Sequence, residues 1–158
     1  MTSNPPPICV EAQMLIRKPV ATVFQAFIDP AVTTKFWFTR SSGSLEIGKT
    51  VTWEWEMYGA SANVVVKDIV PHQKIATEWG DPAVAVDYLF TALAEDQTYV
   101  VIKSYGFRQT GNDLIEVIKD NTGGFTTVLD GLKAYLEHNI QLNLVGDKFP
   151  KEVMTHGK

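Results

Sequence analysis

The sequence predicts an α+β fold in which a curved antiparallel sheet of about six to seven strands wraps around one long C-terminal helix. Three observations predict it. Short segments of alternating apolar and polar residues recur between residues 8 and 106, separated by turns of two to five residues. After residue 106 apolar residues recur every 3.6 residues, as on one face of a helix. Strands and helices that occupy separate parts of a chain are typical of layered α+β proteins.

The composition fits one globular domain. The chain has 158 residues, of which 45% are apolar and 20% charged, and this is ordinary for a domain with a single core. We expect the domain to span residues 8–150, with flexible termini at 1–7, which end in three prolines, and at 151–158. Cys9 is the only cysteine, so an intramolecular disulfide is excluded.

The charge and the N-terminus limit the expected partners and location. The net charge is −4 and the basic residues are scattered, which disfavours binding to nucleic acid or to an anionic membrane. The N-terminal residues lack the basic and apolar regions of a secretion signal, and no segment has the length of a membrane span. We therefore expect a cytoplasmic protein.

The first strand and two short helices open the domain. Residues 8–16 alternate as a strand with one wet face. Pro19 then takes the first position of a helix, where the N–H that proline lacks is not needed. Asp29 and Pro30 end this helix and open a second one, to about Phe36, with Asp29 as its N-cap.

Six further strands are predicted, at residues 45–47, 51–57, 61–70, 75–79, 84–93 and 98–106, with a turn at residues 58–60. In the second of these, alternation places Trp53, Trp55 and Met57 on the face toward the helix. Two tryptophans beside a flexible methionine suit the wall of an apolar pocket as well as a core. Glu54 and Glu56 fall on the opposite face, so we expect them in solvent rather than acting as an acid–base pair.

The long helix is predicted over residues 113–139. Its apolar stripe is formed by Leu114, Ile118, Phe125, Leu129, Leu132 and Leu136. Asp113 and Glu116 resemble a capping box at its start. The pair Gly123-Gly124 interrupts the stripe without shifting its phase, which leaves open a kink, two collinear helices, close packing against the tail or a partner chain, and a hinge that admits a ligand. Apolar residues beyond the helix predict a tail that packs back on the body to about Phe149.

A helix of this length implies a cavity. It would be about 40 Å long at 1.5 Å per residue, and the sheet is the only partner large enough to cover its stripe. Because a long twisted sheet curves, a straight helix touches it at some points and leaves gaps at others. The inward faces of the strands would line such a gap.

Three segments resemble a known family: KPVATVFQAFIDPAVTTKFWF, LEIGKTVTWEWEMYG and GGFTTVLDGLKAYLEHNIQLNLVGDKFP. Over residues 8–150 the chain is similar to bacterial proteins related to the C-terminal domain of the Hsp90 ATPase activator, within the START-like or helix-grip superfamily. The resemblance implies a helix-grip fold with an internal apolar cavity. Relatives include binders of lipids and aromatic natural products, aromatase/cyclases and a co-chaperone domain, and they share no set of catalytic residues.

Twelve residues are candidates for the cavity wall: Trp37, Trp53, Trp55, Met57, Trp79, Tyr88, Phe90, Ile102, Ser104, Phe125, Leu129 and Leu132. The hydroxyl of Ser104 would either orient a ligand or bond a neighbouring carbonyl. No catalytic residue, metal site or cofactor is expected, because the three histidines are widely separated and the inward faces carry almost no titratable groups.

The function that we expect is binding of a small apolar or aromatic molecule between the sheet and the C-terminal helix. One alternative is an enzyme of the cyclase or hydrolase kind that uses the same cavity. Another is a protein-interaction domain like the Hsp90 co-chaperone. A homodimer is left open.

Overall fold

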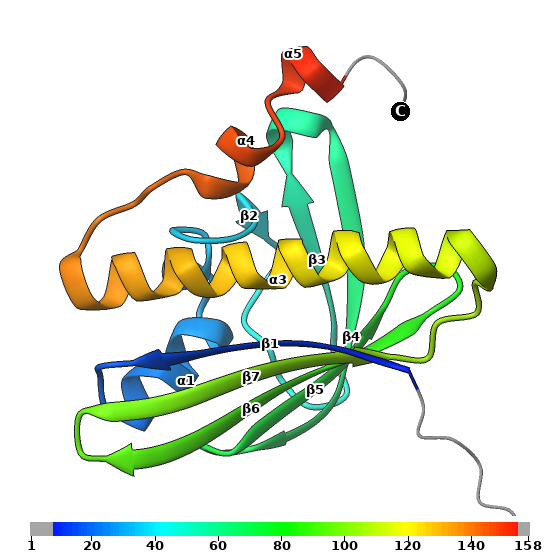
Figure 1. Ribbon diagram of the computed structural model, residues 1–158. Coiled ribbons are helices and arrows are strands. Elements are labelled where there is room, and N and C mark those ends of the chain that lie inside the picture. The colour runs from blue at the N-terminus through cyan, green and yellow to red at the C-terminus, as the bar shows by residue number, and fades with distance from the viewer. Residues whose placement is uncertain (1–7, 155–158) are drawn as a thin grey trace, which may run out of the picture.

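In the computed structural model, which describes residues 8–154, seven strands form one antiparallel sheet and a long helix lies along one face of it (Figure 1). The strands are β1 (Cys9–Ile16), β2 (Arg40–Ser41), β3 (Thr50–Trp55), β4 (Ala60–Val70), β5 (Lys74–Trp79), β6 (Val84–Ala94) and β7 (Gln97–Tyr105). The helices are α1 (Val20–Ile28), α2 (Pro30–Thr33), α3 (Gly111–His138), α4 (Leu144–Lys148) and α5 (Lys151–Met154). Of the termini expected to be flexible, 1–7 and 151–158, residues 1–7 and 155–158 lie outside the described residues, and residues 151–154 form α5.

The strand order is β1-β7-β6-β5-β4-β3-β2, so β1 crosses over to pair with the last strand and the others follow as a meander. This confirms the predicted α+β helix-grip fold. The core lies between the inner face of the sheet and the helices α1 and α3, and Leu129 and Leu132 of α3 are fully buried there. Burying a leucine side chain contributes about 1.5–3 kcal/mol, so this stripe of α3 is what holds the helix to the sheet.

The aromatic segment after α2 forms the centre of the core. Asp29 caps α2 as predicted, with the Ala31 N–H donating to its Oδ1 at 2.9 Å. The helix ends at Thr33, earlier than expected, because the Thr33 hydroxyl donates to the Ala26 carbonyl at 2.6 Å and the chain turns inward. The next apolar residues are thereby buried, and Phe38 stacks on Trp53 with a ring separation of 4.4 Å.

Three local predictions are wrong. Residues 45–47 form no strand, because Leu45 is buried against the end of α1 and its N–H donates to the Ile28 carbonyl at 3.2 Å. The strand predicted to include Met57 ends at Trp55, and a 3-10 turn, Glu56–Tyr58, takes Met57 off the strand face. The capping box is absent because α3 begins before Asp113, after Thr110.

The helix α3 is continuous through Gly123 and Gly124 and runs straight across the sheet in Figure 1. A Cβ built on Gly124 would meet nothing within 4 Å, and one on Gly123 would meet only the flexible end of Lys148, at 3.7 Å. Close packing therefore does not require these two glycines. It does require Gly131, where a Cβ would lie 3.2 Å from the Cβ and 3.3 Å from the carbonyl oxygen of Phe36.

A polar clamp fixes the C-terminal end of α3 to the end of β1. Lys133 Nζ donates to the Leu15 carbonyl at 2.8 Å and to Glu137 Oε2 at 2.7 Å. The same carboxylate oxygen accepts the Arg17 N–H at 2.8 Å, and the Glu137 side chain is only 9% exposed. Burial alone would raise the pKa of Glu137, but the hydrogen bonds from Lys133 and Arg17 and the nearby positive charge lower it on balance.

The clamp makes the fold sensitive to acid. A carboxylate with a lowered pKa stabilises the folded state fully above its ordinary pKa of 4.5, and this stabilisation is lost as the pH falls through the lowered value. Glu137→Gln keeps the shape but not the charge, so we expect it to lower the free energy of unfolding by about 1–2 kcal/mol at pH 7. Urea unfolding at pH 7 and below pH 4 would measure this, and the difference from the unmutated protein should shrink in acid.

The matched control is Glu116→Gln. Glu116 pairs with Lys119 at 3.2 Å on the exposed side of α3, where both side chains are more than 60% exposed. Such surface pairs contribute about 0–1 kcal/mol. Equal losses from the two variants would show that the clamp does not hold α3 in place.

Candidate ligand-binding site

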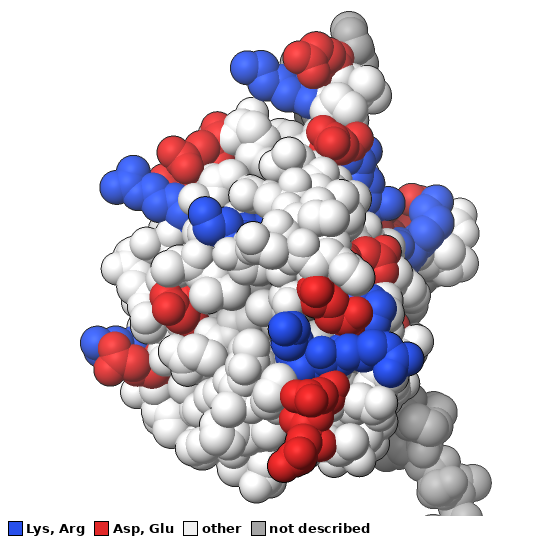
Figure 2. Space-filling view, turned by 90° about the vertical axis from the view of Figure 1, so that its left-hand side faces the viewer, with Lys and Arg blue, Asp and Glu red and all other residues white. Residues whose placement is uncertain are grey.

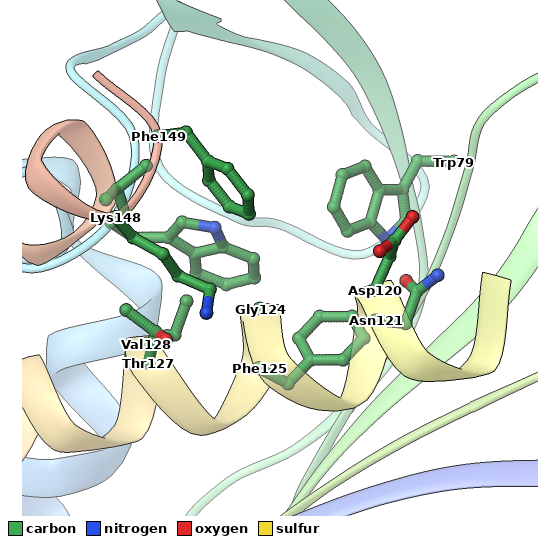
Figure 3. Close-up of a pocket in the computed structure, with 11 residues that line it drawn as sticks. Trp79, Asp120, Asn121, Gly124, Phe125, Thr127, Val128, Lys148 and Phe149 are labelled. Carbon is green, nitrogen blue, oxygen red and sulfur yellow. The ribbon is translucent and has the colours of Figure 1, made fainter. Parts of the chain in front are cut away.

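A cavity of about 220 Å³ lies where α3, the end of β5 and the tail helix α4 meet; we call it the tail cavity. Its wall is formed by Trp37, Trp79, Asp120, Asn121, Gly124, Phe125, Thr127, Val128, Val145, Lys148 and Phe149. Figure 3 shows Phe125, Trp79 and Phe149 around a common space above α3, with Lys148 reaching from α4 toward the helix. The wall is therefore built by segments that are distant in the sequence.

The apolar part of the wall is aromatic. Trp79 is the last residue of β5, and Phe125 comes from the buried stripe of α3. Trp37 makes edge contacts with both, with its ring centre 6.2 Å from that of Phe125 and 6.2 Å from that of Trp79. These contacts hold the three rings in place and leave their free surfaces to the cavity and to Phe149 of the tail.

Gly124 makes room at the wall. A Cβ added to Gly124 would have no other atom within 4 Å. The cavity therefore extends to the backbone of α3 at this residue. A glycine inside a helix costs about 1 kcal/mol relative to alanine. The continuous helix and the open space beside Gly124 indicate that the glycine serves the cavity rather than a break in the helix.

The polar groups of the wall differ in how they are satisfied. Asn121 Nδ2 donates to the Val117 carbonyl at 2.8 Å, and the Thr127 hydroxyl donates to the Gly123 carbonyl at 2.8 Å. Trp79 Nε1 is buried and has no hydrogen-bond partner among the described residues. A buried donor without an acceptor costs about 1–3 kcal/mol in stability. Among the residues of the wall that the structure describes, Trp79 is the one with such an unsatisfied buried atom.

One side chain from the turn between β3 and β4, that of Tyr58, holds the tail beside the cavity. The Tyr58 hydroxyl lies 3.1 Å from the Val145 carbonyl oxygen and 2.6 Å from that of Phe149, so it donates to the backbone at both ends of α4. Burial raises the pKa of Tyr58, which keeps the donated proton in place. Lys148 Nζ lies 5.4 Å from the centre of the Phe149 ring, a cation–π distance.

A second cavity, of about 240 Å³, lies on the other side of α4. Met57, Phe36 and Gly131 line it together with residues 141–146 of the tail, and it shares Trp37 and Val145 with the tail cavity. The segment around Val145 therefore separates two spaces that would join if α4 moved away.

The structure places the twelve predicted wall residues in different surroundings. Trp37, Trp79 and Phe125 line the tail cavity, and Trp37 and Met57 line the second one. Seven lie packed in the core at 5% exposure or less: Trp53, Tyr88, Phe90, Ile102, Ser104, Leu129 and Leu132. Trp55 is half-buried beside the core, with its ring parallel to that of Trp79 at 6.4 Å.

Two of the packed residues carry polar atoms that find no hydrogen-bond partner among residues 8–154. These are the hydroxyls of Ser104 and Tyr88, so Ser104 does not bond a neighbouring carbonyl. Burial raises the pKa of Tyr88, and its hydroxyl stays protonated. Both lie on the inner face of the sheet, away from the two cavities on either side of α4.

Val128 faces the cavity, as the apolar stripe of the long helix predicts. Seven wall residues were missed, of which four come from α3 and three from the tail: Asp120, Asn121, Gly124, Thr127, Val145, Lys148 and Phe149. The glycine pair and the predicted packing of the tail were the available signals. Periodicity does not indicate which part of α3 the tail packs against. The sequence therefore could not predict that the tail and the glycine pair form one cavity wall.

Positive and negative side chains are mixed on the side of the surface drawn in Figure 2. Lys and Arg side chains there lie next to Asp and Glu side chains, around a broad uncharged area, rather than forming a basic patch. In the part of the chain that the structure describes, no His, Cys, Asp and Glu side chains gather as a group that could hold a metal ion. No helix within residues 8–154 is long and apolar enough to cross a membrane.

Comparison with known proteins supports the fold. Protein SSP2350 from Staphylococcus saprophyticus is 30% identical and superimposes with a TM-score of 0.75, over 85% of this chain and 96% of its own. Protein MLL2253 from Mesorhizobium loti is 16% identical (TM-score 0.73; 84% and 99% of the chains). The Aha1 dimer from Colwellia psychrerythraea is also 16% identical (TM-score 0.70; 83% and 97%). The comparison with curated proteins finds no match.

The family assignment rests on the sequence as well as on the fold. The model of the family described as Activator of Hsp90 ATPase homolog 1-like protein matches residues 17–137, which run from the end of β1 through nearly all of α3. This range contains the strands β2 to β7 and all but the last residue of α3, and the resemblance found in the sequence is confirmed. The chain belongs to the Activator of Hsp90 ATPase homolog 1-like family.

Proposed function

We propose that this protein binds a small aromatic molecule in the tail cavity. The observation that carries the proposal is a space of about 220 Å³ walled by the rings of Trp37, Trp79, Phe125 and Phe149, which extends to the bare backbone of Gly124. Largely apolar concave sites with a few convergent polar groups are the usual form of small-molecule sites. Aromatic walls favour a flat ligand because offset and edge-on ring contacts are specific in geometry.

The size of the cavity limits the ligand. Sites for drug-sized ligands usually measure about 300–1,000 Å³, so the tail cavity as it stands suits a ligand of one or two fused rings. A larger ligand would need the second cavity as well. The two spaces join only if the segment around Val145 moves, and that segment is held by Tyr58.

Binding is better supported than catalysis. The titratable side chains of the wall, Asp120 and Lys148, are both exposed, whereas catalytic groups usually act in a site from which water is excluded. The family description and the Aha1 neighbour favour a second candidate function, interaction with an Hsp90-type chaperone, with a homodimer as its assembly. Pull-down with a purified Hsp90-type chaperone would test this second candidate.

Filling the cavity at Gly124 tests the proposed site. In Gly124→Leu the new side chain enters the open space at the wall, so we expect it to weaken binding of two-ring aromatics at least tenfold while the protein stays folded. Intrinsic tryptophan fluorescence reports binding, because two of the four tryptophans line the cavity. Thr126→Leu is the control, since Thr126 is exposed on the same helix and does not line the cavity.

Equal affinities of Gly124→Leu and Thr126→Leu would place the ligand elsewhere. A broad panel of one- and two-ring aromatics and fatty acids that changes neither the fluorescence nor the melting temperature would remove the proposed function altogether.

Loosening the tail tests its part in closing the site. Tyr58→Phe removes the hydroxyl that bonds the two ends of α4. A net loss of about 1 kcal/mol corresponds to roughly fivefold faster hydrogen exchange by local opening. The amides of Asp147 and Phe149 are the probes, because both are hydrogen-bonded within the tail.

A bound ligand should slow exchange at the same amides in the unmutated protein. Tyr99→Phe, on an exposed position of β7, serves as the control and should change neither rate. Unchanged exchange in Tyr58→Phe would mean that the hydroxyl does not hold the tail.

A further inference from the structure

Two charged side chains line the tail cavity, Lys148 from α4 and Asp120 from α3. Among residues 8–154 neither of them forms an ion pair, and they do not pair with each other. The other nine residues of the wall are uncharged. The cavity therefore presents one cation and one anion whose charges the protein itself does not neutralise.

The ammonium group of Lys148 lies at the cavity, over the backbone of α3. Figure 3 shows its side chain pointing from α4 down to the helix, on the side of the cavity opposite Trp79. A Cβ added to Gly123 would lie 3.7 Å from Lys148 Nζ, which places the ammonium close to the surface of the helix. The ring centre of Phe149 lies 5.4 Å from the same atom. The positive charge is thus next to an aromatic part of the wall.

A ligand with an anionic group would supply the partner that this lysine lacks. A lysine ammonium only donates hydrogen bonds, and its bonds to a carboxylate are stronger than those between neutral groups. One lysine balances the single charge of a carboxylate, whereas no second cation lines the wall to balance a phosphate. A carboxylate attached to an aromatic ring also lies near the plane of the ring, so it adds little thickness to a flat ligand.

Asp120 gives the site a direction. In Figure 3 its carboxylate lies on the side of the cavity where Trp79 lies, away from Lys148. A ligand carboxylate placed beside Asp120 would meet a like charge, so one orientation is favoured over the reverse. We propose that the ligand is an aromatic carboxylic acid, bound as its carboxylate, with the charged group beside Lys148 and the rings toward Trp79 and Phe125. This inference rests on the proposed function and names the ligand class for it.

Two ligands of matched shape test the charge, 2-naphthoate and the uncharged 2-naphthamide, measured by calorimetry at pH 7. The variant Lys148→Met keeps the apolar stem and removes the ammonium. We expect the affinity of the acid relative to the amide to fall about fivefold in this variant, between the effect of an exposed ion pair and that of a buried charged hydrogen bond. The ratio cancels any effect of the substitution on the packing of the tail.

Two further variants are the controls. Lys151→Met removes a charge from an exposed lysine of the same tail that does not line the cavity, so the ratio should stay unchanged. Lys148→Arg keeps the charge and should keep the preference for the acid. An equal fall of the ratio in Lys148→Met and Lys151→Met would overturn the inference, because the preference would then come from the general charge of the tail.

Salt and Asp120 provide a second readout. Added sodium chloride screens exposed charges, so it should weaken binding of 2-naphthoate and leave that of 2-naphthamide unchanged. Asp120→Asn removes the like charge at the other side of the cavity and should raise the affinity of the acid relative to the amide. A lower ratio in this variant would contradict the proposed orientation.

The outcomes distinguish this inference from the proposed function. If both compounds bind and Gly124→Leu weakens both, but the ratio is the same in Lys148→Met as in the unmutated protein, the ligand class is wrong while the cavity remains the site. If neither compound binds, the proposed function and this inference fail together.

Discussion

The packing of Gly131 against Phe36 is the constraint on which the rest of the structure depends. Because residue 131 has no side chain, the backbone carbonyl of Phe36 approaches α3 closely, and the aromatic segment that follows is pressed into the core. The Glu137 clamp fixes the same half of the helix to β1. A straight helix fixed at one half cannot follow the curved sheet along the other, and the space that results is closed by the tail and walled by Trp37, Trp79 and Phe125.

The site therefore combines a rigid part with a part that is held by few contacts. Its rings from α3, β5 and the segment after α2 belong to one network of aromatic contacts, whereas α4 is a helix of five residues fastened by the Tyr58 hydroxyl. Ring contacts fix the shape of the cavity. Such a site favours a flat ligand through its rings, while the tail decides how readily the site opens.

The fold follows from the sequence to a large extent, and the site follows only in part. Period-two and period-3.6 patterns predict the sheet and α3, because these elements bury one face each. The patterns fail where side-chain contacts override them, as at Leu45, which is drawn to α1, and at Met57, which leaves the strand in a 3-10 turn. Alternation also cannot say whether an inward residue is packed or faces space. Trp53 stacks on Phe38 and is buried, whereas Trp79 lines the cavity, and this difference depends on where the tail returns to α3.

The central claim is that the tail cavity, and not the second cavity or the outer face of the sheet, holds the ligand. A crystal structure of the protein with 2-naphthol tests this most directly. The account predicts ring density between Phe125, Trp79 and Phe149. Density for the ligand at any other place, with the tail cavity holding only water, would contradict it.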